Sequence, residues 1–288
     1  MLTSAEVRAL APEAFAALDT AATTAERTGD ALLRGLLRRH IAGLLGAEAV
    51  PIDLGKCSND ERDVLGFAEQ FVLDVGGTGV DQRRRALEAL AALGEDPFEF
   101  VMLCYVADWT VRTGAAWRQL FDADCAPDLS VPAAPSLWEA IDASFRAIAR
   151  QNELDPITTE LVRLRGARAH NCRLCKSLRS SRAAAAGATE QTYAMIDEHA
   201  TSDLSRRHRI ALQLVDALIW QPVAFPSGLV DSLHDQFTPA QLVELVLDAA
   251  RNAGNKIAVA LGVDAAHVTE GVEHYDIDAA GTVVYQGF

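Results

Sequence analysis

Apolar residues recur at helical spacing along most of this chain. In RRHRIALQLVDALIW, residues 206–220, they form a wide stripe on one side of a helix: Ile210, Leu212, Leu214, Val215, Leu218 and Ile219. The same pattern runs through residues 31–46, 63–75, 81–93, 97–111, 137–151 and 239–262. Segments rich in glycine or proline fall between them and break the helices. The pattern predicts an all-α fold.

The C-terminal segment differs from the rest. In HYDIDAAGTVVYQGF, residues 274–288, two β-branched residues follow an Ala-Gly step. This arrangement predicts a short extended tail or a hairpin.

A proline-rich stretch divides the chain. Residues 125–136, CAPDLSVPAAPS, contain three prolines and no helical period. We therefore expect two units, residues 1–125 and 137–288, joined by a linker at residues 126–136.

The two units resemble each other. In each, an amphipathic helix is followed by a broken connection and then by a helix that Asp-Pro or Thr-Pro opens. Aligning residues 32–46 with 161–175 places Gly43 and Gly46 opposite Cys172 and Cys175. An internal duplication with one chemically blank copy explains this, and chance similarity between two Ala/Leu-rich stretches is the alternative.

Charge and composition narrow the function. The chain has 26 basic and 40 acidic residues, a formal net charge of −14, and 50% hydrophobic residues. A chain this acidic repels a phosphate backbone, so we expect no nucleic-acid partner. No apolar run is long enough to span a membrane, and the N-terminus lacks the pattern of a secretory signal. We expect a cytoplasmic protein with a sizeable core and no membrane partner.

The chain has five cysteines, an odd number that does not suggest a structural disulfide framework. Cys104 lies in an apolar run and is expected to be buried. Cys172 and Cys175 form a C-x-x-C pair, which in a reducing compartment favours redox or metal chemistry. Two ordinary buried cysteines are one alternative. Zinc is another, although only His170 lies close by and no second C-x-x-C exists.

Glu160 lies twelve residues before Cys172. On one straight helix the two would be roughly 18 Å apart, so they can cooperate only if the chain turns between them. Asn171 is a good N-cap for a helix that begins at Cys172, which predicts an αα-hairpin with its turn near residue 170. Glu160 would then return opposite residues 179–180 and pair with Arg179.

The predicted hairpin places both cysteines in the first turn of a helix. The positive end of the backbone dipole, with Lys176 and Arg179 nearby, would lower the pKa of the thiols. Such a thiolate is a good nucleophile, and the second cysteine can trap it as a disulfide.

Glu160, Cys172-Arg-Leu-Cys175 and the polar Arg179 together resemble the signature of the carboxymuconolactone decarboxylase superfamily, in its alkylhydroperoxidase D-like branch. The resemblance covers residues 137–275 well and residues 30–120 as a weaker repeat. It implies two tandem all-helical units of this kind in a homo-oligomer, with no cofactor. It also implies that Cys175 attacks a hydroperoxide, that Cys172 resolves the product into a disulfide, and that Glu160 serves as the base. A thiol or dithiol would supply the electrons.

The chain departs from this signature at two positions. Arg179 stands where the family commonly has histidine. Leu174 stands between the cysteines, where some members have a second histidine. Arginine cannot pass a proton at neutral pH. Three alternatives follow. Water or His170 passes the proton in place of the family histidine, or the peroxidase activity is weak, or the site serves another redox task. The functional alternatives are a non-catalytic helical assembly protein with a relic site and a lyase of the decarboxylase type.

Overall fold

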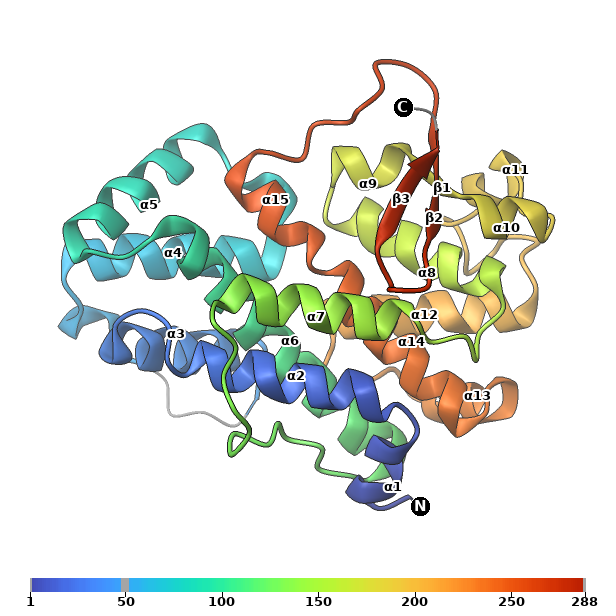
Figure 1. Cartoon of the computed structure of the whole chain (residues 1–288), viewed down its shortest axis with the longest axis horizontal. Coiled ribbons are helices and arrows are strands. Elements are labelled where there is room, and N and C mark those ends of the chain that lie inside the picture. The colour runs from blue at the N-terminus through green and yellow to red at the C-terminus, as the bar shows by residue number, and fades with distance from the viewer. Residues whose placement is uncertain (1, 48–51, 287–288) are drawn as a thin grey trace.

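A computed structural model describes residues 2–47 and 52–286 of the chain. Helices dominate it, as the apolar pattern predicts, and one small sheet is added (Figure 1). The helices are α1 Ser4–Ala9, α2 Pro12–Ala25, α3 Ala31–Leu44, α4 Asn59–Asp74, α5 Val80–Leu93, α6 Pro97–Phe121, α7 Leu137–Ala149, α8 Pro156–Ala169, α9 Arg173–Ser177, α10 Ser181–Ala185, α11 Glu190–Ala194, α12 Arg206–Trp220, α13 Leu229–Gln236, α14 Pro239–Asn252 and α15 Asn255–Leu261. Short 3-10 turns are η1 Leu54–Lys56 and η2 Val75–Gly77, and the strands are β1 Leu178–Ser180, β2 Glu273–Ile277 and β3 Val283–Gln286.

Side-chain caps set where the helices begin. Asp96 accepts a hydrogen bond from the Glu99 amide and opens α6, and Thr238 opens α14 in the same way. A proline follows each cap, where its missing N–H costs nothing. The single predicted segment 239–262 divides into α14 and α15, which are separated by a turn at Ala253 and Gly254. A Cβ at Gly254 would collide with the ring of Phe145.

Helix α6 runs through the centre of the molecule. It contacts α2, α3 and α4 of the first half and α12, α14 and α15 of the second. Helices α2 and α7 lie side by side in front of it (Figure 1). One hydrophobic core therefore runs through both halves, and the predicted burial of Cys104 is confirmed.

A buried ionic cluster also joins the halves. Asp108 of α6 binds Arg112 at 2.7 Å and Lys256 of α15 at 2.8 Å. Burial opposes a charge on Lys256, and the Asp108 carboxylate only partly offsets this, so the pKa of the lysine falls to about 8.

Equivalent helices make equivalent contacts in the two halves. Helix α3 packs on α4 and α6, and α8 packs on α12 and α14. Helix α2 touches α6 as α7 touches α14. Residues 123–136 connect α6 to α7 without helix or strand. This agreement accords with a duplication, which stays an interpretation.

Helix bounds fix the register between α3 and α8. Both have 14 residues, and Asp30 and Asp155 cap their N-termini. The second residue after each helix has a left-handed backbone, with φ 73° at Gly46 and 55° at Asn171. Gly46 therefore corresponds to Asn171.

The predicted alignment of the two glycines with the cysteines is wrong by four residues. Gly43 lies inside α3, whereas Cys172 follows the end of α8. In the structural register Ala47 corresponds to Cys172, and position 50, the counterpart of Cys175, lies outside the described residues. The short apolar repeat of a helix allows both alignments, and only the helix ends distinguish them.

The predicted C-terminal hairpin is confirmed, because β2 and β3 pair antiparallel. A third strand was not predicted: β1 pairs parallel with β2, with Ser180 opposite Tyr275. None of the helices in residues 2–47 and 52–286 has the length and apolar character needed to cross a bilayer.

Candidate redox site at the start of helix α9

The cysteine pair lies just past a tight corner between α8 and α9. Helix α8 ends at Ala169, and the turn at His170 and Asn171 confirms the predicted hairpin. The prediction that Asn171 is the N-cap of α9 is wrong. Its left-handed backbone closes α8, and Cys172 takes the cap position, where its Sγ accepts from the Cys175 amide at 3.2 Å.

Cys172 and Cys175 are joined by a disulfide, with their Cα atoms 5.3 Å apart. This separation is within the normal range for a disulfide. Cys172 is only 1% exposed, whereas Cys175 is half-buried. Of the two sulfur-bearing residues, Cys175 is therefore the one that a reagent from solution reaches first.

Glu160 lies on α8 beneath this corner and is fully enclosed. Its two carboxylate oxygens accept two hydrogen bonds from Arg163, both 2.7 Å. The Ser180 amide donates to Oε1 at 3.0 Å, and the Tyr275 hydroxyl donates to Oε2 at 2.9 Å. The carboxylate is thus held from three separate segments of the chain.

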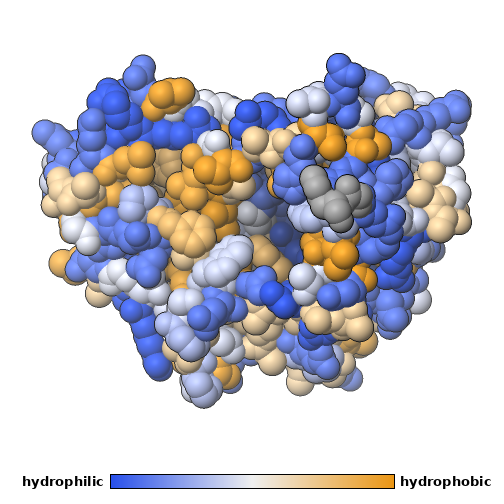
Figure 2. All heavy atoms as spheres, turned by 45° about the horizontal axis from the view of Figure 1, so that its top comes forward, coloured by the Kyte–Doolittle hydropathy of each residue, from blue (hydrophilic) through white to orange (hydrophobic). Residues whose placement is uncertain are grey.

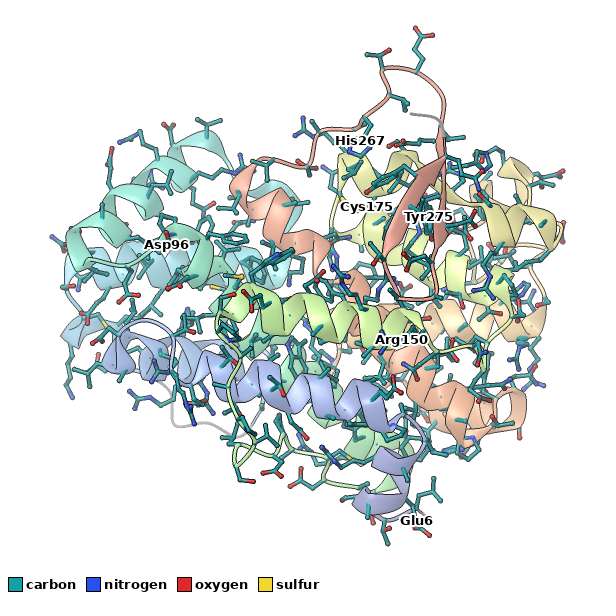
Figure 3. All side chains as sticks on the ribbon, in the orientation of Figure 1. Glu6, Asp96, Arg150, Cys175, His267 and Tyr275 are labelled. Carbon is teal, nitrogen blue, oxygen red and sulfur yellow. A yellow bond between two sulfur atoms is a disulfide. The ribbon has the colours of Figure 1, made fainter. Side chains whose placement is uncertain are left out.

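Arg163 connects Glu160 to the cysteines. Its guanidinium donates to the carbonyl oxygens of Cys175 and Leu178, both at 2.8 Å. It also lies 5.1 Å from the centre of the Tyr275 ring. Burial raises the pKa of the Tyr275 phenol above its ordinary value, so the hydroxyl keeps its proton and can donate the hydrogen bond to Glu160. Figure 3 shows Cys175 on α9 and Tyr275 on β2 in the same region of the molecule.

Arg179 does not pair with Glu160, contrary to the prediction. Its guanidinium binds Glu190 at 2.7 and 2.9 Å and lies over the Tyr193 ring. The turn count was right, since Ser180 does come opposite Glu160. The error arose because residues 178–180 form β1 rather than helix, and neighbouring side chains of a strand point to opposite faces.

His170 occupies the corner but faces another part of the molecule. Its Nδ1 is 2.8 Å from Asn255 Oδ1, and its ring lines a cavity of about 30 Å³ together with Asp108 and Arg112. Burial and the charge of Lys256 lower the pKa of His170 to about 3, so the ring is neutral at physiological pH. The structure thus brings Glu160 and the cysteines together through Arg163, and places His170 and Arg179 in separate contacts.

Other contacts attach α9 to the C-terminal segment. Asp264 accepts hydrogen bonds from the Arg173 amide at 2.8 Å and from its guanidinium at 2.7 Å. On the neighbouring strand β1, the hydrogen bond from the Arg179 guanidinium lowers the pKa of the Glu190 carboxyl group. Figure 2 shows the face that carries α9 and this segment: it is hollowed near its middle, and hydrophobic residues gather beside the hollow.

Sequence reasoning missed three residues of this site. Arg163 follows Glu160 by three positions on α8, and this helical spacing could have indicated the pair. Tyr275 and Glu190 come from distant segments, and no local pattern marks them. Within the described ranges no group of three or more histidine, cysteine or acidic residues is placed to hold a metal ion.

Comparison with known proteins finds relatives in Mycobacterium tuberculosis. The chain is 37% identical over 269 residues to the uncharacterized proteins MT2376 (strain CDC 1551) and Rv2313c (strain H37Rv), which covers 89% of this chain and 93% of each relative. No family model and no solved structure matches the chain.

Proposed function

The chain belongs to the same protein family as MT2376 and Rv2313c, and we propose that it is a thiol-dependent peroxidase and disulfide oxidoreductase. The observation that carries the proposal is the Cys172–Cys175 disulfide, which joins a half-buried cysteine to a buried one. The resemblance to the alkylhydroperoxidase D-like branch of the carboxymuconolactone decarboxylase superfamily supports it. On this proposal the protein works in the cytoplasm as a homo-oligomer.

The difference in burial between the two cysteines supports distinct roles for them in this proposal. The Cys175 thiolate attacks the outer oxygen of a hydroperoxide, the S–O bond forms, the O–O bond breaks, and the leaving alkoxide takes a proton from water to become the alcohol. The buried thiol of Cys172 then attacks the sulfenic sulfur, so that the disulfide forms and water leaves. A dithiol donor restores both thiols by exchange and supplies the two electrons.

Glu160 acts through Arg163 in this proposal. Its carboxylate oxygens already accept four hydrogen bonds, so a proton from a thiol would have to displace one of them. Because Arg163 donates to the Cys175 carbonyl, Glu160 holds α9 in the geometry that allows the sulfurs to meet. Glu160 is therefore a positioning residue in this mechanism rather than the base.

Thiol titration tests the proposal. We expect the reduced protein to lose two thiols per equivalent of hydroperoxide and to recover them with a dithiol. Replacing Cys175 with serine should abolish the reaction, and replacing Cys172 should leave Cys175 open to over-oxidation, because no resolving thiol remains. Cys104→Ala is the matched control, since burial raises the pKa of that thiol. Intact mass without a two-hydrogen loss on mild oxidation of the wild type contradicts the proposal.

A further inference from the structure

A large groove lies in the first half between α2, α3 and α6. Its volume is about 700 Å³, within the range of small-molecule sites. Apolar side chains such as Ala22, Leu37 and Val106 form most of its wall, and Leu32 is 79% exposed at it. A second cavity of about 200 Å³ adjoins it and shares Thr110, Val111, Ala126 and Pro127 with its wall. Both spaces are mostly apolar.

The charged residues of the groove are mainly basic. Arg34, Arg38 and Arg39 line it from α3, and Glu26 is the acid among the described lining residues. Arg38 forms an ion pair with Glu26 but keeps a side chain that is 54% exposed. In a chain with a formal net charge of −14, a groove with more arginines than acids is suited to an anion.

The register between α3 and α8 shows what this groove lacks. Counting from the capping Asp30 and Asp155, Arg38 takes the position of Arg163, and Gly35 takes the position of Glu160. The first half thus has the arginine but a glycine in place of the glutamate, and Arg38 pairs with Glu26 instead. A Cβ added at Gly35 would meet no other atom within 4 Å, so the space of the missing side chain is open.

The corresponding space of the second half is nearly filled. It measures about 60 Å³ and lies between α8 and α14. Tyr275 and Ile277 of β2 and the adjoining Ser180 line it from outside, where the C-terminal segment covers it. In the first half, residues 126, 127 and 129 of the linker contribute to the groove wall, and the groove stays open.

We propose that the open groove binds an amphipathic carboxylate of the fatty-acid type. Its carboxylate would meet the guanidinium of Arg38, in the way that Glu160 meets Arg163 in the second half. Its alkyl chain would lie along the alanine and valine side chains of α6. Arginine is suited to this because its planar fork binds carboxylates bidentately.

Calorimetric titration of the full-length protein with dodecanoate tests this inference. We expect one molecule to bind per groove at micromolar concentration. Gly35→Glu supplies the missing carboxylate from the protein itself and should weaken binding by at least about tenfold, because like charges repel. Gly43→Glu is the matched control, since it adds the same charge to α3 outside the groove lining, and should leave binding unchanged. Both variants should fold, because glutamate suits a helix interior better than glycine.

Two further measurements distinguish a bound carboxylate from other possible occupants of the groove. Dodecyltrimethylammonium has the same chain with the opposite charge and should bind at least about tenfold more weakly than dodecanoate. Sedimentation of wild type and Gly35→Glu should give the same mass. Equal dodecanoate binding by both glycine variants overturns the proposal, as does failure of the wild type to bind. A change of oligomeric state in Gly35→Glu alone also overturns it, in favour of a second protein chain. None of these readouts uses thiol chemistry, so their outcome is independent of the redox proposal.

Discussion

The corner after α3 and the corner after α8 have the same backbone and different chemistry. Each follows a helix of 14 residues that an aspartate caps, and each turns at a left-handed residue. After the turn, the first corner continues with Ala47 and the second corner continues with Cys172. The comparison teaches that the turn itself is the same in both halves, and that the chemistry of each corner depends on a few side chains placed around it.

Those side chains form two layers. On the helix itself, Glu160 stands where the first half has Gly35. Above the helix, the C-terminal strands bring Tyr275 onto Glu160, and in the first half the same side is an open groove. On the proposed function, the corner of the second half would thus depend on a buried carboxylate and a covering segment as well as on the cysteines. The following predictions test this comparison.

The largest effect should come from Glu160→Gln. It leaves the buried guanidinium of Arg163 without its counter-charge, which costs about 3–5 kcal/mol of unfolding free energy. The matched change in the first half, Glu26→Gln, breaks partly exposed pairs with Arg38 and Arg34 and should cost only about 0–1 kcal/mol. Chemical denaturation measures both. Equal costs would show that the two arginines lie in equivalent environments, against the comparison.

A smaller loss should follow from Tyr275→Phe. The variant removes one hydrogen bond to a buried carboxylate, worth about 1.5–3 kcal/mol. Tyr285, its neighbour across the hairpin, is 37% exposed, and Tyr285→Phe serves as the control with an expected change within about 0.5 kcal/mol. If thermal unfolding gives the same midpoint for Tyr275→Phe and wild type, the covering strand does not hold Glu160.

Asp248 should make the second half sensitive to pH. Counted from the helix caps, it takes the position of Val106 in the first half, and burial together with nearby Glu244 raises its pKa to about 8. The folded protein therefore keeps a proton that the unfolded chain releases above pH 4, so this residue costs more stability as the pH rises towards 8.

Asp248→Asn removes this penalty. We expect it to stabilise the protein by at least about 1 kcal/mol more at pH 8 than at pH 5, measured by denaturant titration at both values. Asp231→Asn, at an exposed position of α13, is a control that should show no such difference. A gain that is the same at both pH values would mean that Asp248 titrates normally.

The smallest effect on the redox reaction is expected for Arg179→His. The side chain lies on the face of β1 away from Glu160, and its partner Glu190 is 64% exposed. Losing that pair should cost about 0–1 kcal/mol, and losing the hydrogen bonds to the Lys176 and Leu178 carbonyl oxygens should add about 0.5–1.5 kcal/mol each. The rate of disulfide formation with hydroperoxide should stay at the wild-type value. A clear rise in that rate would restore the role of a proton relay to this position.

The sequence by itself determined the core of most of the longer helices and the corner. Apolar spacing and capping residues act within a few positions, so α12 was predicted at Arg206–Trp220 and the turn at residue 170. The C-x-x-C pair and the C-terminal hairpin are local features too, and both were recognised. In each case the residues that decide the structure are neighbours in the chain.

Only the tertiary structure decided which side chains meet. Nothing near Glu160 in the chain indicates Tyr275, which lies 115 positions away and reaches it through the pairing of β2 with β1. The short strand at residues 178–180 forms because β2 lies beside it, and this turned Arg179 towards Glu190. Partners of a buried charge depend on the packing of distant segments. The sequence therefore determined where the site lies, and the fold determined how its charges are paired.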